Sequence, residues 1–382
     1  MTQTLGIQAQ SDRTASRSRV VALDGLRAIA VMLVIAYHAG QIEFGWIGVP
    51  IFFVLSGHFI TRILVEKNVG SRPTRALNFF RNRALRLAPL YFAACAALTL
   101  LAIGNLGPRP LRGDLPFLWT WTYNLRGLFP GYVDNPLYDH TWSLGVEVQL
   151  YLIWAALAFS LPRRWLAWVL IGLVIAGPLI RILAWLALGG YSESTRLIVT
   201  YMLPTTYLDA FAIGGCTALP EIRSRLGNPH RWLAGILALT AGGGLVGIVS
   251  ALQHTGHVPG DLGYPSEFPA HDGWIWGYSV IALLAGAIVL VLLENERAAR
   301  YLSSRLLVRI GVISYGIYLL HRPILRLVQQ HLTHWPAPWS ALAIIGTVIA
   351  LVLTIAAAEA SYRLFETRFM ARKRGALIGA RN

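Results

Sequence analysis

Long apolar runs separated by short polar segments dominate this chain of 382 residues. A helix needs about 17 to 25 mostly apolar residues to cross a hydrocarbon core of roughly 30 Å. Ten segments meet this requirement: 27–44, 46–65, 86–104, 142–161, 165–189, 198–219, 232–252, 274–293, 309–329 and 339–358. Backbone polar groups inside lipid must be satisfied within the segment, so helices are the expected spanning elements. The sequence therefore predicts an all-α polytopic membrane helix bundle of about ten transmembrane helices.

The basic residues are distributed unevenly along the chain. Only 13% of residues are charged, against roughly 25% in an ordinary soluble protein, yet the formal net charge is +15. With a cytoplasmic N-terminus, 26 of the 33 Lys and Arg fall in the cytoplasmic segments 1–27, 62–86, 162–165, 221–231, 294–309 and 363–382. This asymmetry follows the positive-inside rule and predicts that both termini are cytoplasmic. It also argues against a nucleic-acid partner, because no basic face interleaved with stacking aromatics remains.

Three regions are expected along the chain. Residues 1–20 are polar and rich in Ser and Arg, which is typical of a flexible cytoplasmic tail. Residues 21–370 form one membrane domain, and residues 371–382 form a basic cytoplasmic tail. The spans and their loops use up the chain, so no appended soluble catalytic domain is expected. The two cysteines, Cys95 and Cys216, lie within predicted spans and form no metal or disulfide pattern.

A few ionisable residues interrupt the predicted spans. They are His38, His58, Glu147, Asp209 and His321. Placing ionisable side chains in a bilayer has a high free-energy cost, so they usually face the protein interior or a water-filled cavity. We therefore expect the functional site among them.

The first predicted helix carries Arg27 and His38 on one face. They are eleven residues apart, so they point within about 20° of each other and lie about 16 Å apart along the axis. Asp24 is three residues from Arg27 and in reach of an ion pair. A structural interpretation also exists: Arg27 as a membrane anchor, Asp24 as a helix cap and His38 as a core histidine bonded to a carbonyl.

Glu147 is the predicted partner of His38. His38 lies six residues from the outer end of its predicted helix, and Glu147 lies about 9 Å below the outer start of its own. At matching depths the carboxylate would fix the imidazole tautomer and stabilise the imidazolium form. A purely structural hydrogen bond between helices is the alternative.

A predicted cytoplasmic segment contains Arg81, Arg83 and Arg86. Arginine binds phosphate through two parallel hydrogen bonds, so this cluster suits a phosphorylated ligand. A plain positive-inside loop would need no ligand at all.

Several motifs occur in a recognisable order. They are Asp24-Gly25-Leu26-Arg27 with His38, GVPIFFVLSG over residues 48–57, Arg83-x-x-Arg86-x-x-Pro89, Trp142-Ser143-Leu144 with Val146-Glu147, residues 208–214 around Asp209, Ser314-Tyr315-Gly316-Ile317-Tyr318-Leu319-Leu320-His321, and Ser361-Tyr362-Arg363-x-x-Glu366. In these motifs, and in their order over about residues 20–370, the sequence resembles membrane acyltransferase family 3, the bacterial integral-membrane O-acyltransferases.

The resemblance implies transfer of an acyl group, usually acetyl from acetyl-CoA, to a hydroxyl of a sugar or similar acceptor. Acyl-CoA is then a donor substrate, and no permanently bound cofactor or metal is expected. The resemblance assigns His38 as the catalytic histidine, Arg27 as an essential basic residue and Glu147 as the acidic position, with Arg83 and Arg86 on the donor side. It makes residues 21–370 a membrane acyltransferase domain of the bacterial cytoplasmic (inner) membrane.

Other motif residues are expected to support the site. Ser143 and Tyr318 are candidate oxyanion donors, and the remaining candidates are Asp24, Trp142, Asp209 and His321. The sequence departs from the family pattern at Pro50, His58, Gly145 and Val148. These departures leave acceptor preference and proton routing open, and His58 fits a packing role slightly better than an acceptor contact.

Several functional hypotheses stay open on the sequence alone. His38 either deprotonates the acceptor directly or carries the acyl group itself. The expected acceptor is a cell-surface or exported polysaccharide, or its lipid-linked unit, with a macrolide-type small molecule as the alternative. A transporter using His38, Glu147 and Asp209 as a proton relay is a different class, and a scaffold of an envelope-synthesis complex is a third. Expected partners are acyl-CoA, a glycan or lipid-linked sugar, and membrane lipid.

Overall fold

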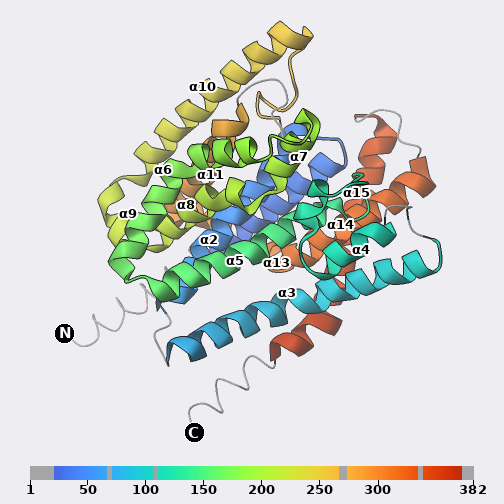
Figure 1. Ribbon diagram of the computed structural model, residues 1–382, viewed down its shortest axis with the longest axis horizontal. Coiled ribbons are helices and arrows are strands. Elements are labelled where there is room, and N and C mark those ends of the chain that lie inside the picture. Colours follow the sequence, from blue (N-terminus) through green and yellow to red (C-terminus); the bar gives the residue numbers. More distant parts are fainter. Residues whose placement is uncertain are drawn as a thin grey trace.

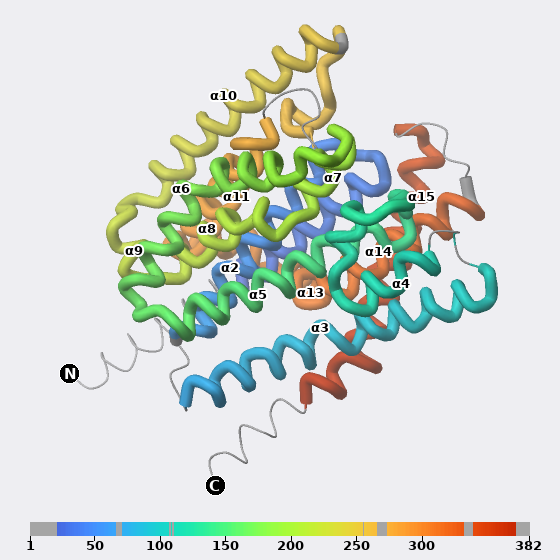
Figure 2. The backbone as a smooth tube through the Cα atoms, in the orientation of Figure 1, coloured from blue at the N-terminus to red at the C-terminus, as the bar shows by residue number. Residues whose placement is uncertain are grey.

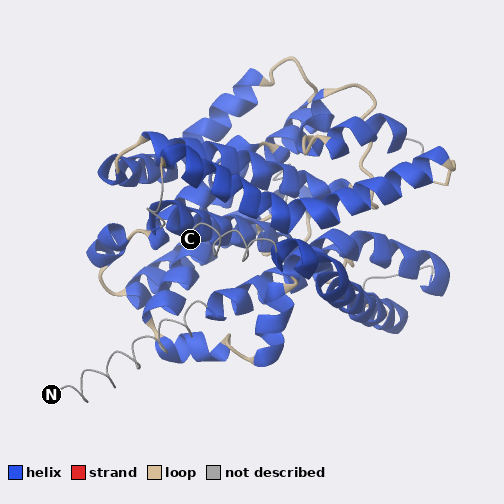
Figure 3. Cartoon of the chain, turned by 90° about the horizontal axis from the view of Figure 1, so that it is seen from below, coloured by secondary structure: helices blue, strands red, loops and turns tan. Residues whose placement is uncertain are grey.

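The computed structural model describes residues 21–66, 71–106, 108, 111–265, 273–333 and 339–371. Within these ranges the chain forms helices and loops and no strand (Figure 3), which confirms the all-α prediction. The predicted tails, residues 1–20 and all but the first residue of 371–382, lie outside the described residues.

Eight of the described helices are long and apolar enough to cross a membrane. They are the first helix (Val21–His38), α2 (Gly48–Glu66), α3 (Arg72–Ile103), α5 (Trp142–Ser160), α6 (Arg163–Ala187), α10 (Pro229–Thr255), α11 (Gly273–Glu294) and α15 (Ala341–Ser361). Shorter helices connect them: α4 (Leu111–Trp119), α7 (Glu193–Met202), α8 (Leu208–Ala218), α9 (Pro220–Leu226), α12 (Glu296–Tyr301), α13 (Arg305–Val312) and α14 (Ser314–Val328). The protein is thus an integral membrane helix bundle.

Two of the ten predicted spans are broken in the structure. Segment 198–219 divides into α7 and α8, which meet at 54° and make a ninth span if counted as one. Leu203 is extended there because it precedes Pro204, which disfavours helical backbone before it. Segment 309–329 divides at Ile313 into α13 and α14. The break places the start of α14 inside the bundle.

The helices surround α2, which packs against α5, α8 and α11. In Figure 1 the turn between α5 and α6, α9 and the start of α3 lie toward the lower left, whereas α4 and α7 lie toward the upper right. Segments predicted to be cytoplasmic therefore gather at one end of the bundle. Helix α10 lies along an outer edge and packs mainly on α11 (Figure 2).

The first helix ends earlier than predicted, at His38 itself. Gly40 has a φ of 74°, and the amides of Gly40 and Gln41 bond back to the carbonyls of Tyr37 and Ala36. This is a glycine-terminated Schellman ending. His38 is therefore at the outer end of the helix and not six residues inside it.

The predicted outer loop is folded against the bundle over its described residues 111–141. Arg126 donates to Asp114 at 2.7 Å, and the Tyr138 hydroxyl donates to the other oxygen of Asp114, also at 2.7 Å. Asp114 is fully buried, and its pairing stabilises the loop because an unpaired buried carboxylate is costly. The loop thereby holds Asp139 and His140 above the start of α5.

A candidate acyl-transfer site

A cavity of about 250 Å³ lies between the first helix, α2, α3, α5 and α14. Its polar lining residues are Asp24, Arg27, Ser56, Arg83, Arg86, Ser143, Glu147, Tyr151, Ser314, Tyr315 and Tyr318. Arg27 and Arg86 lie toward the predicted cytoplasmic side. Ser143 stands in the first turn of α5, at the outer side, and Tyr318 lies one turn along α14 from Ser314. The cavity thus joins the cytoplasmic arginines to the outer half of the bundle.

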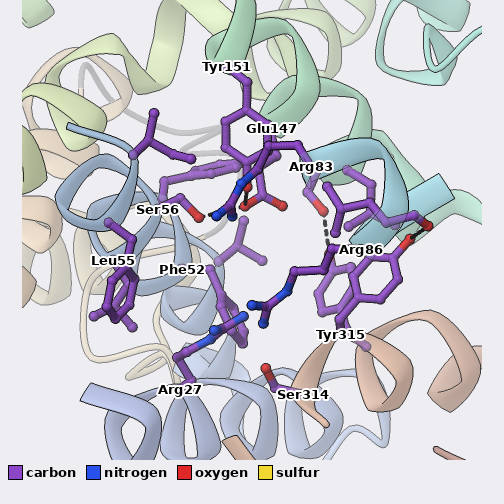
Figure 4. A pocket seen from close by; sticks show the side chains of 18 of the residues that line it. Arg27, Phe52, Leu55, Ser56, Arg83, Arg86, Glu147, Tyr151, Ser314 and Tyr315 are labelled. Carbon is purple, nitrogen blue, oxygen red and sulfur yellow. Dashed lines mark hydrogen bonds between the residues drawn. The ribbon is translucent and has the colours of Figure 1, made fainter. Parts of the chain in front are cut away.

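Three predicted arginines point into this cavity. Figure 4 shows Arg27 and Arg86 extending toward one another from opposite walls, with Arg83 beside Glu147. Arg27 lies 3.8 Å from Asp24, the pairing that their spacing predicts. Arg81 is exposed on α3 and is not part of the lining.

The cavity wall also carries polar atoms with unused hydrogen-bonding capacity. The Ser314 hydroxyl is fully buried and has no hydrogen-bond partner in the described part of the chain, and the same holds for Nε of Arg83. A buried group without a partner costs about 1 to 3 kcal/mol. Together with two facing guanidinium groups, these atoms favour an anionic ligand.

The predicted pairing of His38 with Glu147 is wrong. Glu147 accepts hydrogen bonds from the Ser56 hydroxyl at 2.5 Å and from the Tyr151 hydroxyl. It lies one turn further toward the cytoplasm than Ser143, whereas His38 stands at the outer end of its helix. The depths that seemed to match therefore differ, and Glu147 belongs to the arginine cavity.

His38 pairs instead with His321. Nδ1 of His38 lies 2.8 Å from Nε2 of His321, and Nδ1 of His321 lies 2.5 Å from the carbonyl oxygen of Tyr318. A carbonyl only accepts, so Nδ1 of His321 carries the hydrogen and Nε2 of a neutral ring is an acceptor. His38 must then donate from Nδ1, which leaves its Nε2 as a free lone pair. That is the protonation pattern of a general base.

Tyr318 and Ser143 separate the cavity from the two histidines. Their hydroxyls lie 2.6 Å apart, and each also lies 3.1 Å from the carbonyl oxygen of His140. The Tyr318 ring lies 5.5 Å from that of His321. This hydroxyl pair thus stands between the cavity and the His38–His321 pair.

Two predicted supporting residues lie elsewhere. Asp209 pairs with Arg181 at 3.0 Å, and both are almost fully buried. Trp142 packs against Tyr201 and Tyr207. Neither lines the cavity, and both positions are explained by packing.

Two departures from the family pattern have structural reasons. His58 is buried, contacts the Thr217 hydroxyl at 2.8 Å and does not line the cavity, which agrees with a packing role. A Cβ atom at Gly145 would lie 2.7 Å from the carbonyl oxygen of Trp121. Glycine therefore lets the outer loop approach α5 closely.

Some residues of the site were not predicted from the sequence. Ser56, Tyr151, His140 and Ser314 all contact or line it. Ser56 and Ser314 lie within motifs that carry the family resemblance, and Tyr151 lies four residues after Glu147 on the same helix face. His140 had no such signal, because it reaches the site only through the folding of the outer loop.

A family model described as an acyltransferase domain matches residues 20–359. The chain belongs to this acyltransferase family. The family resemblance seen in the sequence motifs is thereby confirmed, and the cavity with its histidine pair lies inside the matched region.

Similar proteins are 27 to 29% identical to this chain. O-acetyltransferase OatA of Staphylococcus aureus is 27% identical over 92% of this chain and 57% of its own length. Peptidoglycan O-acetyltransferase OatA of Listeria monocytogenes is 29% identical over 92% of this chain and 56% of its own. A putative membrane-bound transacylase, BcsY of Komagataeibacter xylinus, is 28% identical over 94% and 85%.

The chain thus spans little more than half of the two OatA proteins. No solved structure matches this chain.

Proposed function

We propose that this protein is an O-acetyltransferase that transfers an acetyl group from acetyl-CoA to a hydroxyl of a cell-surface or exported glycan. The observation that carries the proposal is the cavity that joins Arg27, Arg83 and Arg86 to the Ser143–Tyr318 pair beside His38 and His321. Two relatives named as O-acetyltransferases, one of them a peptidoglycan O-acetyltransferase, support the reaction and the glycan acceptor. A macrolide-type acceptor is the alternative substrate.

The donor would enter from the cytoplasmic side. The volume of the cavity, about 250 Å³, is slightly below the usual volume of ligand pockets, about 300 to 1,000 Å³. It suits the narrow arm of the coenzyme, with the phosphates near Arg27 and Arg86 and the nucleotide outside, on the side of Arg81. The thioester would then lie near Ser143 and Tyr318.

His38 would supply the base for the transfer. Its Nε2 lone pair takes the proton of the acceptor hydroxyl as the oxygen attacks the thioester carbonyl. The hydroxyl pair of Tyr318 and Ser143 would donate one hydrogen bond to the developing oxyanion in place of its bond to the His140 carbonyl. The C–S bond breaks, the coenzyme leaves as thiolate, and the proton held by His38 passes to that sulfur.

The same geometry permits a covalent relay in which the acetyl group first rests on Nε2 of His38. Radiolabel trapped on His38 after incubation with donor alone would favour this route. Because His38 stands at the outer end of its helix, we place the acceptor on the outer face of the cytoplasmic membrane.

The deciding experiment deletes the gene and restores it as the original sequence, as His38→Ala or as His331→Ala. His331 is an exposed histidine just after α14 and serves as the matched control. We expect ester-linked acetate on surface glycans to disappear on deletion and to return with the original and His331→Ala forms only.

Two outcomes would contradict the proposal. Full recovery by His38→Ala would indicate a scaffold whose histidine performs no chemistry. Purified protein that moves a glycan or protons without consuming acetyl-CoA would indicate a transporter.

A further inference from the structure

A second cavity lies on the other side of the bundle, between α6 and α10. Its volume is about 720 Å³, and its walls come from α6, α8, α9, α10 and α11. Among the eight long helices α10 is the least buried inside the protein, and it follows the outer edge of the bundle (Figure 2). The cavity is therefore a groove beside the lipid phase, apart from the acyl-transfer site.

The apolar part of the groove has the length of one lipid leaflet. Along α6 its wall runs through Trp168, Ile171 and Ile175, which recur at spacings of three and four. From Arg164 to Ile175 the helix rises about 16 Å, close to half of a hydrocarbon core of roughly 30 Å. On α10 the facing wall is Trp232 and Ile236. The groove thus offers apolar space for acyl chains along about one leaflet.

The mouth of the groove is basic. Arg163, Arg164 and Arg225 line it, and all three belong to segments that the charge distribution places in the cytoplasm. Arg163 donates two hydrogen bonds of 2.7 Å to Glu221. These bonds hold the pKa of the Glu221 carboxyl below its usual range, so the carboxylate stays ionised and neutralises Arg163.

Arg164 and Arg225 carry the uncompensated charge. Both are exposed, and neither has a carboxylate partner among the residues that the structure describes. The guanidinium group of Arg164 lies 5.7 Å from the Trp165 ring, which keeps it near the membrane surface. Basic pockets between helices on the cytoplasmic side attract anionic lipid headgroups.

We propose that this groove binds one anionic diacyl phospholipid of the cytoplasmic leaflet, with its phosphate at Arg164 and Arg225 and its chains between α6 and α10. The inference is independent of the proposed acyl transfer. It concerns other helices and other arginines.

The test is native mass spectrometry of the purified protein titrated with dioleoylphosphatidylglycerol or dioleoylphosphatidylcholine. We expect tighter binding of the anionic dioleoylphosphatidylglycerol than of the zwitterionic dioleoylphosphatidylcholine. Each arginine near an anionic headgroup is worth about fivefold in affinity, so Arg164→Gln with Arg225→Gln should weaken it about 25-fold. The matched control is Arg231→Gln, an exposed arginine on α10 outside the groove, which should leave binding unchanged.

A second pair of variants tests the apolar part. Ile236→Trp fills the groove and should abolish retention of the lipid, whereas Leu237→Trp, at the adjacent exposed position, should not. Equal affinity for the two lipids would show that the groove contacts bulk lipid without selecting a headgroup, and would overturn the proposal. An effect of Arg231→Gln equal to that of the double variant, or a dimer that Ile236→Trp dissociates, would overturn it as well.

Discussion

At the His38 ring the orienting partner is another imidazole. In a histidine–carboxylate pair the negative charge stabilises the imidazolium form of the base. A neutral His321 fixes the tautomer but adds no such charge, and Arg322, which bonds to Asp139, stands near the same cluster. We therefore assign His321 a positioning role, which keeps the Nε2 lone pair of His38 directed away from the pair.

His321→Leu removes the imidazole acceptor of the His38 ring, which also bonds to the backbone of Val34. We expect kcat to fall about 100-fold, within the usual range for general-base catalysis, with KM for acetyl-CoA unchanged. The fall should be smaller for His321→Gln, whose amide oxygen still accepts. The measurement is kcat as a function of pH. Loss of the hydrogen bond that fixes the His38 tautomer should alter the acidic limb of this profile.

Two comparators make this prediction specific to the histidine pair. His331→Leu changes an exposed histidine nearby in the chain and should leave kcat and KM unchanged. Glu147→Gln should leave the acidic limb unchanged, because Glu147 contacts Ser56 and Tyr151 and not His38. The prediction would be contradicted if Glu147→Gln shifted the acidic limb of the kcat profile and His321→Leu left kcat unchanged. Glu147 would then be the residue that orients His38.

At the scale of elements, one buried ion pair connects three helices. Arg181 of α6 bonds to Asp209 of α8 and to the carbonyl of Ile275 on α11 at 2.8 Å, and Ser279 of α11 bonds to Asp209 at 2.5 Å. The cluster leaves Asp209 fully partnered, so a proton relay through it would first have to break the pair. Its place in the fold is structural.

Arg181→Met should leave the Asp209 carboxylate buried and unpaired. We expect a loss of about 3 to 5 kcal/mol in the free energy of unfolding, the usual result of breaking one side of a buried pair. Adding Asp209→Asn should recover part of this loss because it removes the stranded charge. Thermal unfolding of the detergent-solubilised protein gives the measurement, with the exposed Arg231→Met as control; equal melting temperatures in all forms would refute the structural role.

At the scale of the whole molecule, the site is a path through the bundle. The arginines occupy the predicted cytoplasmic side and the histidines the outer side, with Ser143 and Tyr318 between them. Such an arrangement suits a donor and an acceptor that approach from opposite faces of the membrane. It also confines Arg27, Arg83 and Arg86 to one end of the path.

Arg86→Gln should therefore weaken donor binding and spare the chemistry. A charge-assisted hydrogen bond is worth about 1.5 to 3 kcal/mol, so KM for acetyl-CoA should rise about 10-fold or more at similar kcat. With acetyl-pantetheine, which lacks the nucleotide and its phosphates, the variant and the original should behave alike. An equal loss with both donors would show that Arg86 does not bind phosphate, and Arg231→Gln controls for net charge.

The sequence by itself determined the class of the molecule, an all-α membrane helix bundle, and it predicts the orientation of the helices. The thickness of the bilayer sets the length of an apolar segment that can span it, so segment length identifies the spans. The distribution of arginines predicts which ends of the spans face the cytoplasm. The local pair of Asp24 and Arg27 was also predictable, since both lie on one helical turn. The penalty that lipid places on ionisable residues singled out His38, Glu147 and His321 as candidate site residues.

Only the tertiary structure decided which of these residues meet. His38 and His321 are 283 residues apart, and no periodicity relates them. Their contact depends on the end of the first helix at His38 and on the break at Ile313. Glu147 bonds instead to the Ser56 and Tyr151 hydroxyls and lines the same cavity as the arginines. Spacing along one helix is a property of the sequence, whereas depth across two helices is a property of their packing.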